Sequence, residues 1–427
     1  MKKLTSSFWI ALTLFSLLGQ IAWVVENMYL NVFLYKMFHA SAFEISLMVS
    51  LSAVTATVTT VLVGALSDKL GRRKIFIAGG YVLWGVSILA FLLLRVDVLT
   101  ALFPMASAAA LGVTLTVIFD CVMTFFGSSA NDAAFNAWLT DSAAGDRRGA
   151  AEGINAMMPL VAILAVFGGF MGFDQSKADS WTLIFAIIGG LVTVAGILGF
   201  FLIKEEPLPP CREGYFKTVI HGFLPSTVKK NAPLYFALGA FVLFNISIQI
   251  FMPYLILYYE VSLGMKDYVL IMAPAILLAS VATAFWGKVY DKRGYGFSAL
   301  FPLISLGMGY LILFFFRHAA PVFLGSLLMM CGYLAGMAVF GAKIRDLIPE
   351  GRAGMFQGVR IFSQVLIPGV VGPMIGTWVL SGAEKIQNGD GTESFIPNAY
   401  IFLAALCALA LTALFLLLTR ALRRRAK

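Results

Sequence analysis

Four ionisable side chains lie inside long apolar stretches of the sequence: Glu26, Asp120, Asp132 and Arg360. An ionisable group at the middle of a bilayer costs at least about 2.5–3.5 kcal/mol, so each of these residues is a candidate for function. Glu26 lies about ten residues from the end of its stretch and Asp120 about thirteen from the start of its own, which places both roughly 15–20 Å deep. Two carboxylates that face each other in a low-dielectric cavity cannot both ionise cheaply, so this pair would bind a proton. The alternative is a packing role, in which each carboxylate accepts hydrogen bonds from neighbouring Asn and Tyr side chains.

The other two ionisable residues have different interpretations. Asp132 follows Asn131 near the end of its stretch, after Gly127-Ser-Ser. A kinked, polar helix end explains Asp132 without substrate chemistry, and we favour that interpretation. For Arg360 two interpretations stay open: it contacts a substrate oxygen or an acid across a cavity, or it extends to the inner membrane surface.

A second group of polar and aromatic side chains lies in the same kind of stretch. Its members are Gln20, Trp23, Asn27, Asn31, Asn245, Gln249, Tyr254 and Gln364. Gln20, Trp23 and Asn27 recur at intervals of three and four, so they share one helix face. Amide groups beside an aromatic plane suit a neutral, sugar-like ligand with many hydroxyl groups. Interhelical hydrogen bonding is the alternative for any one residue, but the set as a whole favours a cavity.

Membrane-spanning helices must position these residues, because the composition does not fit a soluble chain. Of 427 residues, 60% are hydrophobic and 12% are charged, whereas globular proteins carry about 25% charged residues. This balance excludes a cytosolic enzyme, a disordered chain and a secreted disulfide scaffold. A span needs roughly 20 apolar residues, and the sequence predicts twelve of them. They are 8–36, 44–67, 75–94, 107–139, 150–172, 181–203, 233–259, 268–290, 297–316, 320–344, 354–381 and 398–419.

The positive charge of the chain is a topology signal. With the N-terminus inside, the inner connections hold 24 Lys and Arg residues and the outer ones hold six. This bias predicts a multi-pass protein with both termini in the cytoplasm, and we expect the bacterial inner membrane. The net charge of +9 therefore needs no nucleic-acid partner. The expected partners are the lipid bilayer and a small-molecule substrate, and we expect a monomer.

The sequence repeats itself at the ends of several spans. Gly64, Asp68 and Gly71 follow the second span, and Gly287, Asp291 and Gly294 follow the eighth at the same internal spacing. A second repeat relates the ends of spans four and ten, and it comprises Asp141 with Arg147 and Asp346 with Arg352. These matches predict a duplicated six-helix unit, an arrangement typical of secondary transporters. We expect an N-terminal bundle over 1–204, a cytoplasmic linker over 205–232 and a C-terminal bundle over 233–427.

The stretch Gly64-Ala-Leu-Ser-Asp68-Lys-Leu-Gly71-Arg72-Arg73-Lys74 resembles the signature of the major facilitator superfamily. The resemblance implies an all-α membrane protein with twelve transmembrane helices in two pseudo-symmetric six-helix bundles, the major facilitator fold. It also implies alternating access around a cavity lined by spans one, four, seven and ten. The repeated motif would then act as a gate: Asp68 would meet the start of span eleven near Gly354, and Asp291 would meet span five near Gly149. We expect Asp68→Asn to favour the inward-open state.

Two short stretches resemble particular branches of that superfamily. Asn136-Ala-Trp-Leu-Thr-Asp141, followed by Arg147, is similar to a stretch of the glycoside–pentoside–hexuronide cation symporters. Gly19-Gln20 with Glu26 is similar to the sucrose–proton symporters. In melibiose-permease-type members, aspartates bind the cation at the places held here by Ala56 and Thr60. This departure favours protons over sodium as the coupling ion.

The resulting prediction is a secondary transporter for a small polar solute, with a sugar or glycoside favoured, that is coupled to protons. The first alternative is a proton-driven drug or metabolite antiporter, because Gly369-Val-Val-Gly372-Pro373-Met-Ile-Gly376 resembles the glycine–proline antiporter motif. That motif belongs on span five, however, and here it lies on span eleven. A receptor or scaffold on the same fold is an alternative of another class. We expect no enzyme, no cofactor and no metal site, because neither the three histidines nor the four cysteines form a catalytic or metal-ligand pattern.

Overall fold

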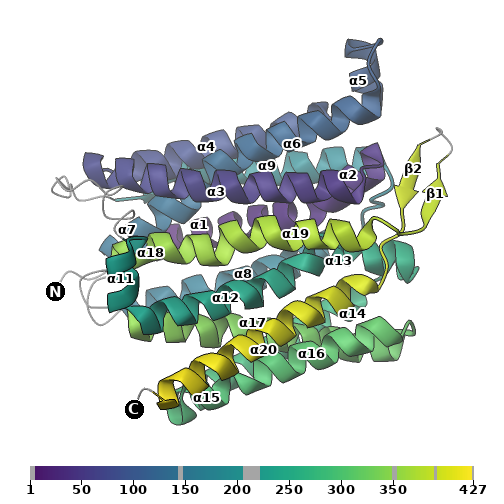
Figure 1. The fold of residues 1–427 in the computed structure, drawn as a ribbon. Helices are drawn as coiled ribbons and strands as arrows, with labels where there is room; N and C mark the ends of the chain where they lie inside the picture. Colours follow the sequence, from purple (N-terminus) through teal and green to yellow (C-terminus); the bar gives the residue numbers. More distant parts are fainter. Residues whose placement is uncertain (1–4, 143–147, 205–221, 349–352, 389–391, 426–427) are drawn as a thin grey trace. The chain divides into compact units, whose positions relative to one another are not determined.

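The computed structural model describes residues 5–142, 148–204, 222–348, 353–388 and 392–425. The chain divides into two compact units, Met1–Thr218 and Val219–Lys427. The described residues form twelve helices that are long and apolar enough to cross a membrane, six of them in each unit. The twelve predicted spans are therefore confirmed, and their ends agree to within four residues. Figure 1 shows the long helices of both units as coiled ribbons.

Helices are the only regular secondary structure in the described part of the N-terminal unit. Three spans contain more than one helical segment: α1, η1 and α2 form the first, α4 and η2 the third, and α6, η3 and α7 the fourth. In chain order the elements are α1 (Ser6–Val24), η1 (Val25–Tyr29), α2 (Leu30–Phe38), α3 (Ala42–Leu70), α4 (Lys74–Ala90), η2 (Phe91–Leu93), α5 (Val96–Leu102), α6 (Ala108–Gly127), η3 (Ser128–Phe135), α7 (Asn136–Ser142), α8 (Arg148–Phe170) and α9 (Ala178–Leu202).

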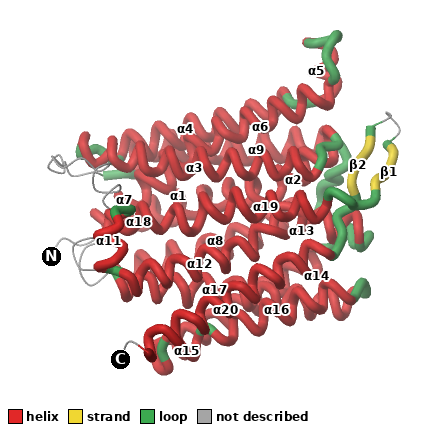
Figure 2. Tube along the Cα trace, viewed as in Figure 1, coloured by secondary structure: helices red, strands yellow, loops and turns green. Residues whose placement is uncertain are grey.

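The C-terminal unit adds a small hairpin to its helices. Its elements are α11 (Pro225–Lys230), α12 (Ala232–Phe251), η5 (Met252–Tyr254), α13 (Leu255–Leu257), η6 (Tyr258–Ser262), α14 (Val269–Arg293), α15 (Tyr295–Ser298), α16 (Leu300–Phe315), α17 (Ala319–Leu347), α18 (Ala353–Ile361), η7 (Phe362–Leu366), α19 (Ile367–Leu380), β1 (Lys385–Gln387), β2 (Glu393–Phe395) and α20 (Tyr400–Arg425). Strands β1 and β2 pair antiparallel, with Lys385 opposite Phe395 and Gln387 opposite Glu393. Figure 2 shows this hairpin in yellow, beyond the ends of the long helices. Sequence periodicity did not predict it, because each strand has only three residues.

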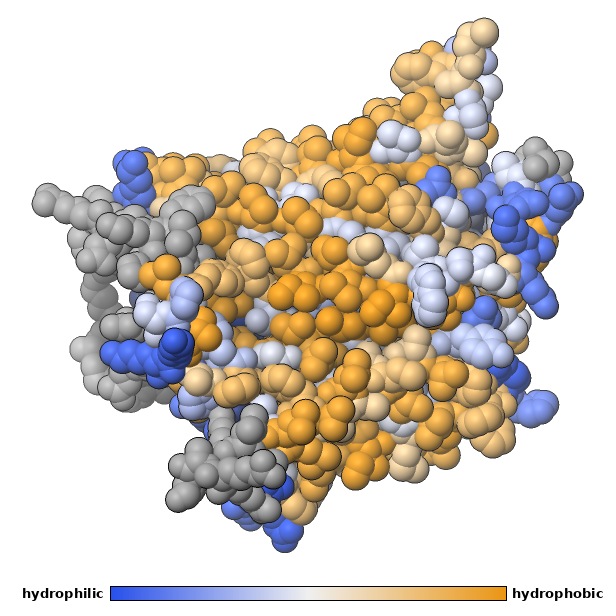
Figure 3. All heavy atoms as spheres, in the orientation of Figure 1, coloured by the Kyte–Doolittle hydropathy of each residue, from blue (hydrophilic) through white to orange (hydrophobic). Residues whose placement is uncertain are grey.

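Helix α3 shows how the sequence suits a lipid environment. Apolar side chains recur along one of its faces at intervals of three and four residues and stay exposed, among them Leu47, Leu51, Val54 and Val58. In water such a stripe would be a binding surface, but on a spanning helix it faces lipid. On the face of the molecule drawn in Figure 3, hydrophobic side chains cover the middle of the long helices and hydrophilic ones gather at their ends.

Local signals in the sequence fix where α3 begins and ends. The Ser41 hydroxyl accepts a hydrogen bond from the Glu44 amide, and Glu44 Oε2 accepts one from the Ser41 amide at 2.7 Å, which completes a capping box. At the other end Gly71 adopts a φ of +62°, a left-handed conformation that favours glycine. The second motif glycine of the other unit, Gly294, likewise has a positive φ of +70° after α14. These conformations give the sharp turns that the motif spacing predicts.

Buried aromatic side chains form the core of each unit. In the N-terminal unit the ring of Phe33 contacts those of Phe91, Trp181 and Phe185, with centroid distances of 5.0–6.5 Å. In the C-terminal unit Phe402 contacts Tyr258 at 5.0 Å. Aromatic pairs in these edge-on or tilted geometries stabilise packing by about 0.5–1.5 kcal/mol beyond the area they bury.

Candidate functional site

The carboxylate of Glu26 lies in a small network of hydroxyl groups inside the N-terminal unit. Glu26 belongs to the π-helical segment η1 and is 6% exposed. Its Oε1 accepts a hydrogen bond from Ser52 Oγ of α3 at 2.9 Å and another from Thr124 Oγ1 of α6 at 2.8 Å. The two hydroxyl oxygens are 2.7 Å apart. One carboxylate oxygen therefore holds three spanning helices together.

Asp120 lies one turn before Thr124 on α6 and is 1% exposed. It faces the same Ser52 hydroxyl and is close enough to Glu26 for the two acids to interact electrostatically. The structure thus brings together the two acids that the sequence predicts as a pair. Within the described residues, Glu26 Oε2 and Asp120 Oδ1 are both buried and accept no hydrogen bond.

Asp132 is close enough to Glu26 for the two carboxylates to interact electrostatically. It belongs to the π-helical segment η3, where it accepts a hydrogen bond from Ser128 Oγ at 3.0 Å. The interruption of regular helix agrees with the kinked, polar helix end that the sequence predicts there. Its neighbour Asn131, which the sequence did not single out as a site residue, donates a 2.6 Å hydrogen bond to the buried Tyr81 hydroxyl. Pi-helical turns are rare and recur at functional sites, and here two of them carry Glu26 and Asp132.

The amides of the first span bond partly to their own helix. Asn27 donates to the backbone oxygen of Trp23 at 2.8 Å, and Asn31 donates to that of Asn27 at 3.0 Å. The Trp23 ring lies 5.0 Å from that of Trp84. Asn27 is exposed, Gln20 and Trp23 are half-buried, and Asn31 is buried. Gln20, Trp23 and Asn27 therefore keep exposed or partly exposed side chains, whereas Asn31 belongs to the interior of the unit; the predicted cavity face stays a prediction.

In the C-terminal unit the corresponding residues are packed more tightly. Asn245 is buried and donates to the backbone oxygen of Phe241 at 2.8 Å. Half-buried Gln249 lies directly against Gly372 of α19. Tyr254 is fully buried, with its hydroxyl 3.1 Å from Thr377 Oγ1 and its ring 6.1 Å from that of Phe395 in the hairpin. Of these three, Gln249 alone keeps a partly exposed side chain.

Arg360 and Gln364 form a pair in the C-terminal unit. Arg360 Nε donates to Gln364 Oε1 at 3.2 Å, one turn later along α18 and η7. Among the described residues no carboxylate pairs with Arg360, and its charged neighbour is Arg345. A half-buried guanidinium with a neutral partner can still donate hydrogen bonds to a ligand oxygen.

Glu260 in η6 is a further half-buried acid, which sequence reasoning missed because it lies at the end of its span.

The first copy of the repeated motif forms an ion pair whose cation is buried and whose carboxylate is exposed. Arg73 is 7% exposed; its Nε lies 3.2 Å from Asp141 Oδ2, and its Nη1 donates to Ser67 Oγ at 2.6 Å. Arg72 beside it is exposed. In the second copy the Tyr290 hydroxyl donates to Asp346. Arg147 and Arg352 lie outside the described residues, and the surroundings of Asp68, Gly149 and Gly354 are likewise not described, so the predicted gate contacts stay predictions.

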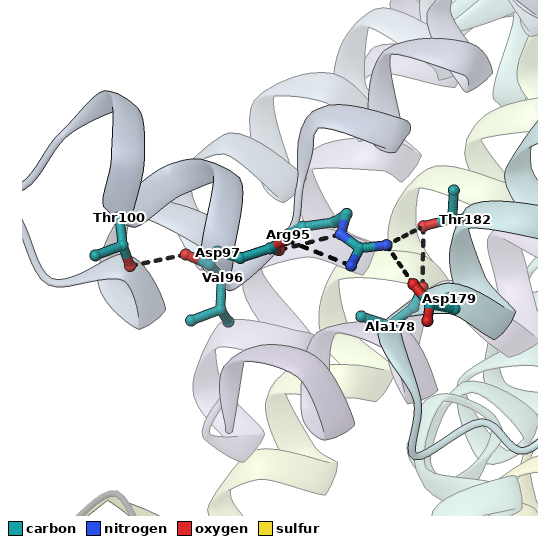
Figure 4. A network of polar contacts seen from close by, with 7 residues as sticks. All are labelled: Arg95, Val96, Asp97, Thr100, Ala178, Asp179 and Thr182. Carbon is teal, nitrogen blue, oxygen red and sulfur yellow. Dashed lines mark hydrogen bonds and ion pairs between the residues drawn. The ribbon is translucent and has the colours of Figure 1, made fainter.

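A second polar network lies away from these acids (Figure 4). Arg95, which precedes α5, bonds to Asp97 at 3.1 Å, to Asp179 at 2.7 Å and to Thr182 at 3.0 Å. The hydrogen bond from Arg95 lowers the pKa of the Asp97 carboxyl. Because Asp179 and Thr182 belong to the first turns of α9, this network ties the connection between spans three and four to the start of span six.

A family model described as Major Facilitator Superfamily matches residues 7–368. The chain belongs to this superfamily. It is therefore a transporter rather than an enzyme, and an all-α, multi-pass integral membrane protein. No curated protein sequence matches it at a significant level. Within the described residues, no group of three or more His, Cys, Asp or Glu side chains could hold a metal ion.

Solved structures show the same fold at low sequence identity. A bacterial homologue of the human lysosomal transporter Spinster, in an inward-facing and unoccupied conformation, is similar with a TM-score of 0.69 and 16% identity over 96% of this chain and 94% of that one. The nucleoside transporter NupG is similar with a TM-score of 0.70 and 11% identity over 96% of this chain and 98% of that one. The xylose transporter XylE from E. coli, in a partially occluded inward-open conformation, is similar with a TM-score of 0.67 and 14% identity over 95% of this chain and 98% of that one.

Proposed function

We propose that this chain is a secondary transporter that couples the movement of a small polar solute, a sugar or glycoside, to protons by alternating access. The observation that carries the coupling is the pairing of Glu26 with Asp120 around the Ser52 and Thr124 hydroxyls. Each acid keeps one buried oxygen without a hydrogen bond among the described residues. A carboxylate oxygen that accepts no hydrogen bond is free to carry a proton.

The arrangement suits reversible proton binding rather than packing alone. A packing role would be complete if all four carboxylate oxygens accepted hydrogen bonds, as buried polar groups ordinarily do. Here Glu26 Oε1 has two donors while Glu26 Oε2 and Asp120 Oδ1 have none in the described part of the chain. Since the two acids interact electrostatically, a proton on one stabilises the charge on the other.

Each unit carries residues that we propose for solute contact. Gln20, Trp23 and Asn27 present an open amide and aromatic face on the first span, and Arg360 with Gln364 presents donors on the eleventh. Amide, guanidinium and indole groups match the hydroxyls and ring faces of a sugar. Transporters of the same fold include the xylose transporter XylE and the nucleoside transporter NupG, and both names denote solutes with several hydroxyl groups.

Uptake by the purified chain in proteoliposomes tests the proposal. A panel of pentoses, hexoses, glycosides and nucleosides is offered with an imposed pH gradient, with a sodium gradient and with neither, while an internal dye reports lumenal pH. We expect one solute class to accumulate only with the pH gradient and to carry protons inward with it. Accumulation that persists without either gradient, or that follows sodium alone, would refute proton coupling; proton movement opposite to the solute would indicate the antiporter.

Two conservative variants locate the coupling. Glu26→Gln and Asp120→Asn should each abolish gradient-driven accumulation but leave exchange of solute across the membrane measurable. Asp97→Asn is the matched control, because Asp97 is an exposed acid outside the spans. Intact accumulation in both buried variants would remove these acids from the mechanism while leaving the transporter assignment untouched.

A further inference from the structure

A cavity of about 660 Å³ lies within the C-terminal unit, among the ends of four spanning segments. Its walls come from the first turn of α12, from α15 and the start of α16, from the last turns of α17 and from α20 near Arg420. In Figure 1, α15 lies beside the C-terminal end of α20. The volume falls in the range of about 300–1,000 Å³ that is usual for small-molecule sites. None of the residues of the candidate solute site lines it.

The lining of the cavity is mostly apolar and is partly exposed at the surface of the protein. Three of the lining side chains, Phe236, Leu300 and Leu417, are 41%, 52% and 64% exposed. These three exposed side chains, which we call the apolar mouth, belong to spanning segments and would therefore face the hydrocarbon of the bilayer. A ligand that enters there must itself be largely apolar.

Two cations stand at the same cavity. Lys343 and Arg420 both line it, and the Lys343 ammonium lies 5.8 Å from the centroid of the Tyr295 ring. Within the described residues neither cation forms an ion pair with a carboxylate. Lys343 lies one turn from the end of α17, and Arg420 lies at the end of the last spanning segment. Both are therefore at headgroup depth, where the sequence continues with Arg423, Arg424 and Arg425.

We propose that this cavity is a binding site for one anionic phospholipid. Lys343 and Arg420 bind the phosphate, and an acyl chain lies along the apolar walls between α12, α16 and α20. Basic pockets between helices at the membrane surface are the kind of site that recognises anionic headgroups. The apolar mouth favours the lipid over a free phosphate, because a soluble anion gains nothing from Phe236, Leu300 and Leu417. Because none of the proposed solute-contact residues lines this cavity, the lipid would serve anchoring or regulation of the C-terminal unit.

Native mass spectrometry of the purified full chain in detergent tests this site with palmitoyl-oleoyl phosphatidylglycerol, and with the matching phosphatidylcholine as the neutral lipid. We expect one phosphatidylglycerol to bind at least about tenfold more tightly than phosphatidylcholine. The Lys343→Gln/Arg420→Gln double variant should weaken that binding roughly thirtyfold. Each cation near a membrane surface contributes a comparable part of the binding free energy, so the loss of both multiplies two similar reductions in affinity. The matched control is Lys288→Gln/Lys292→Gln, which removes two exposed cations of α14 outside the cavity.

Two further measurements separate the sources of the signal. Ala413→Phe places a ring among the lining residues and should lower binding while Lys343 and Arg420 remain; glycerol 3-phosphate, the headgroup alone, should not displace the lipid. The proposal is overturned if phosphatidylcholine binds equally well, or if the double variant binds like the unchanged chain. If the α14 control loses as much phosphatidylglycerol binding as the double variant, general surface charge explains the binding. If glycerol 3-phosphate displaces the lipid, the cavity is a site for free anions. Either result would also overturn the proposal. Thermal unfolding of each variant confirms that it is folded.

Discussion

The Tyr290 hydroxyl donates a hydrogen bond to Asp346, and this contact replaces a three-residue contact in the other half of the chain. In the N-terminal unit Ser67 occupies the motif position that Tyr290 holds in the C-terminal unit, and Arg73 links it to Asp141. The place of Arg73 in the second copy is taken by Gly296. The long Tyr290 side chain thus takes the place of the short Ser67 side chain together with the bridging Arg73 guanidinium.

Removal of the Tyr290 hydroxyl should weaken the C-terminal unit modestly. A hydrogen bond to a charged group contributes about 1.5–3 kcal/mol when buried, and Asp346 is exposed, so we expect Tyr290→Phe to cost about 1 kcal/mol. The free energy of unfolding in mixed micelles measures the effect. In a double-mutant cycle with Asp346→Asn, the two losses should not add. A coupling energy near zero would mean that the contact contributes nothing.

The first copy should be more sensitive, because its cation is buried. Arg73→Gln leaves Asp141 without its ion pair and Ser67 without its donor, and we expect a loss of about 2–3 kcal/mol in the unfolding free energy. Arg72→Gln is the matched control: the neighbouring arginine is exposed and should lose less than about 0.5 kcal/mol. Arg73→Lys should not restore stability, since an ammonium lacks the fork that bonds two partners. Equal losses at the two arginines would contradict this assignment.

The sequence predicted the fold well because hydrophobic length and charge are local signals. Twelve spans follow from runs of about 20 apolar residues, and the structure confirms all twelve. The sequence did not predict the interruption at η1 or the hairpin of β1 and β2, and at η3 it predicted a kinked helix end but not a π-helical turn. A π-helical turn depends on one extra residue in the packing of a helix, and a three-residue strand has too few side chains to show alternation.

The candidate site was predictable in part. Burial cost alone singles out Glu26 and Asp120, and the structure brings them together. Ser52 and Thr124 were not predicted, because a hydroxyl in an apolar helix can bond to its own backbone and carries no signal of its partner. Tyr254 was assigned to a cavity face but lies buried beneath Phe395, a contact with a hairpin that the sequence did not reveal.

The stability of Glu26→Gln separates a coupling role from a packing role. A glutamine amide oxygen can still accept from Ser52 and Thr124, and the substitution removes a buried acid. We therefore expect the unfolding free energy to stay the same or to rise by about 1 kcal/mol while coupled transport is lost. Glu26→Leu is the comparison, because it deprives both hydroxyls of their acceptor and should cost about 1–3 kcal/mol. If glutamine destabilises as much as leucine, the carboxylate is needed for packing.

The glycine–proline stretch of span eleven has a packing explanation. A Cβ added at Gly372 would lie 2.4 Å from Gln249 Cβ and 2.8 Å from the Gln249 carbonyl carbon of α12. Gly372→Ala should therefore force the two helices apart and cost about 1–3 kcal/mol. Gly168→Ala on span five is the matched control: nothing lies within 4 Å of its added Cβ, so it should be neutral or stabilise by up to about 1 kcal/mol. Retained stability in Gly372→Ala would mean that α12 and α19 can separate freely.

The hairpin should respond to acid through one carboxylate. Lys385 Nζ donates to Glu393 Oε2 at 2.7 Å, and this hydrogen bond lowers the pKa of the Glu393 carboxyl. Because the folded pKa lies below the unfolded value of about 4.3, the ion pair stabilises the hairpin fully above that pH and ceases to do so as the pH falls through the folded pKa. Hydrogen exchange at the strand amides, corrected for the intrinsic effect of pH, should accelerate over this window. Glu393→Gln should remove the pH dependence, whereas Glu384→Gln, on an acid outside the ion pair, should keep it; an unchanged response in Glu393→Gln would assign the acid sensitivity elsewhere.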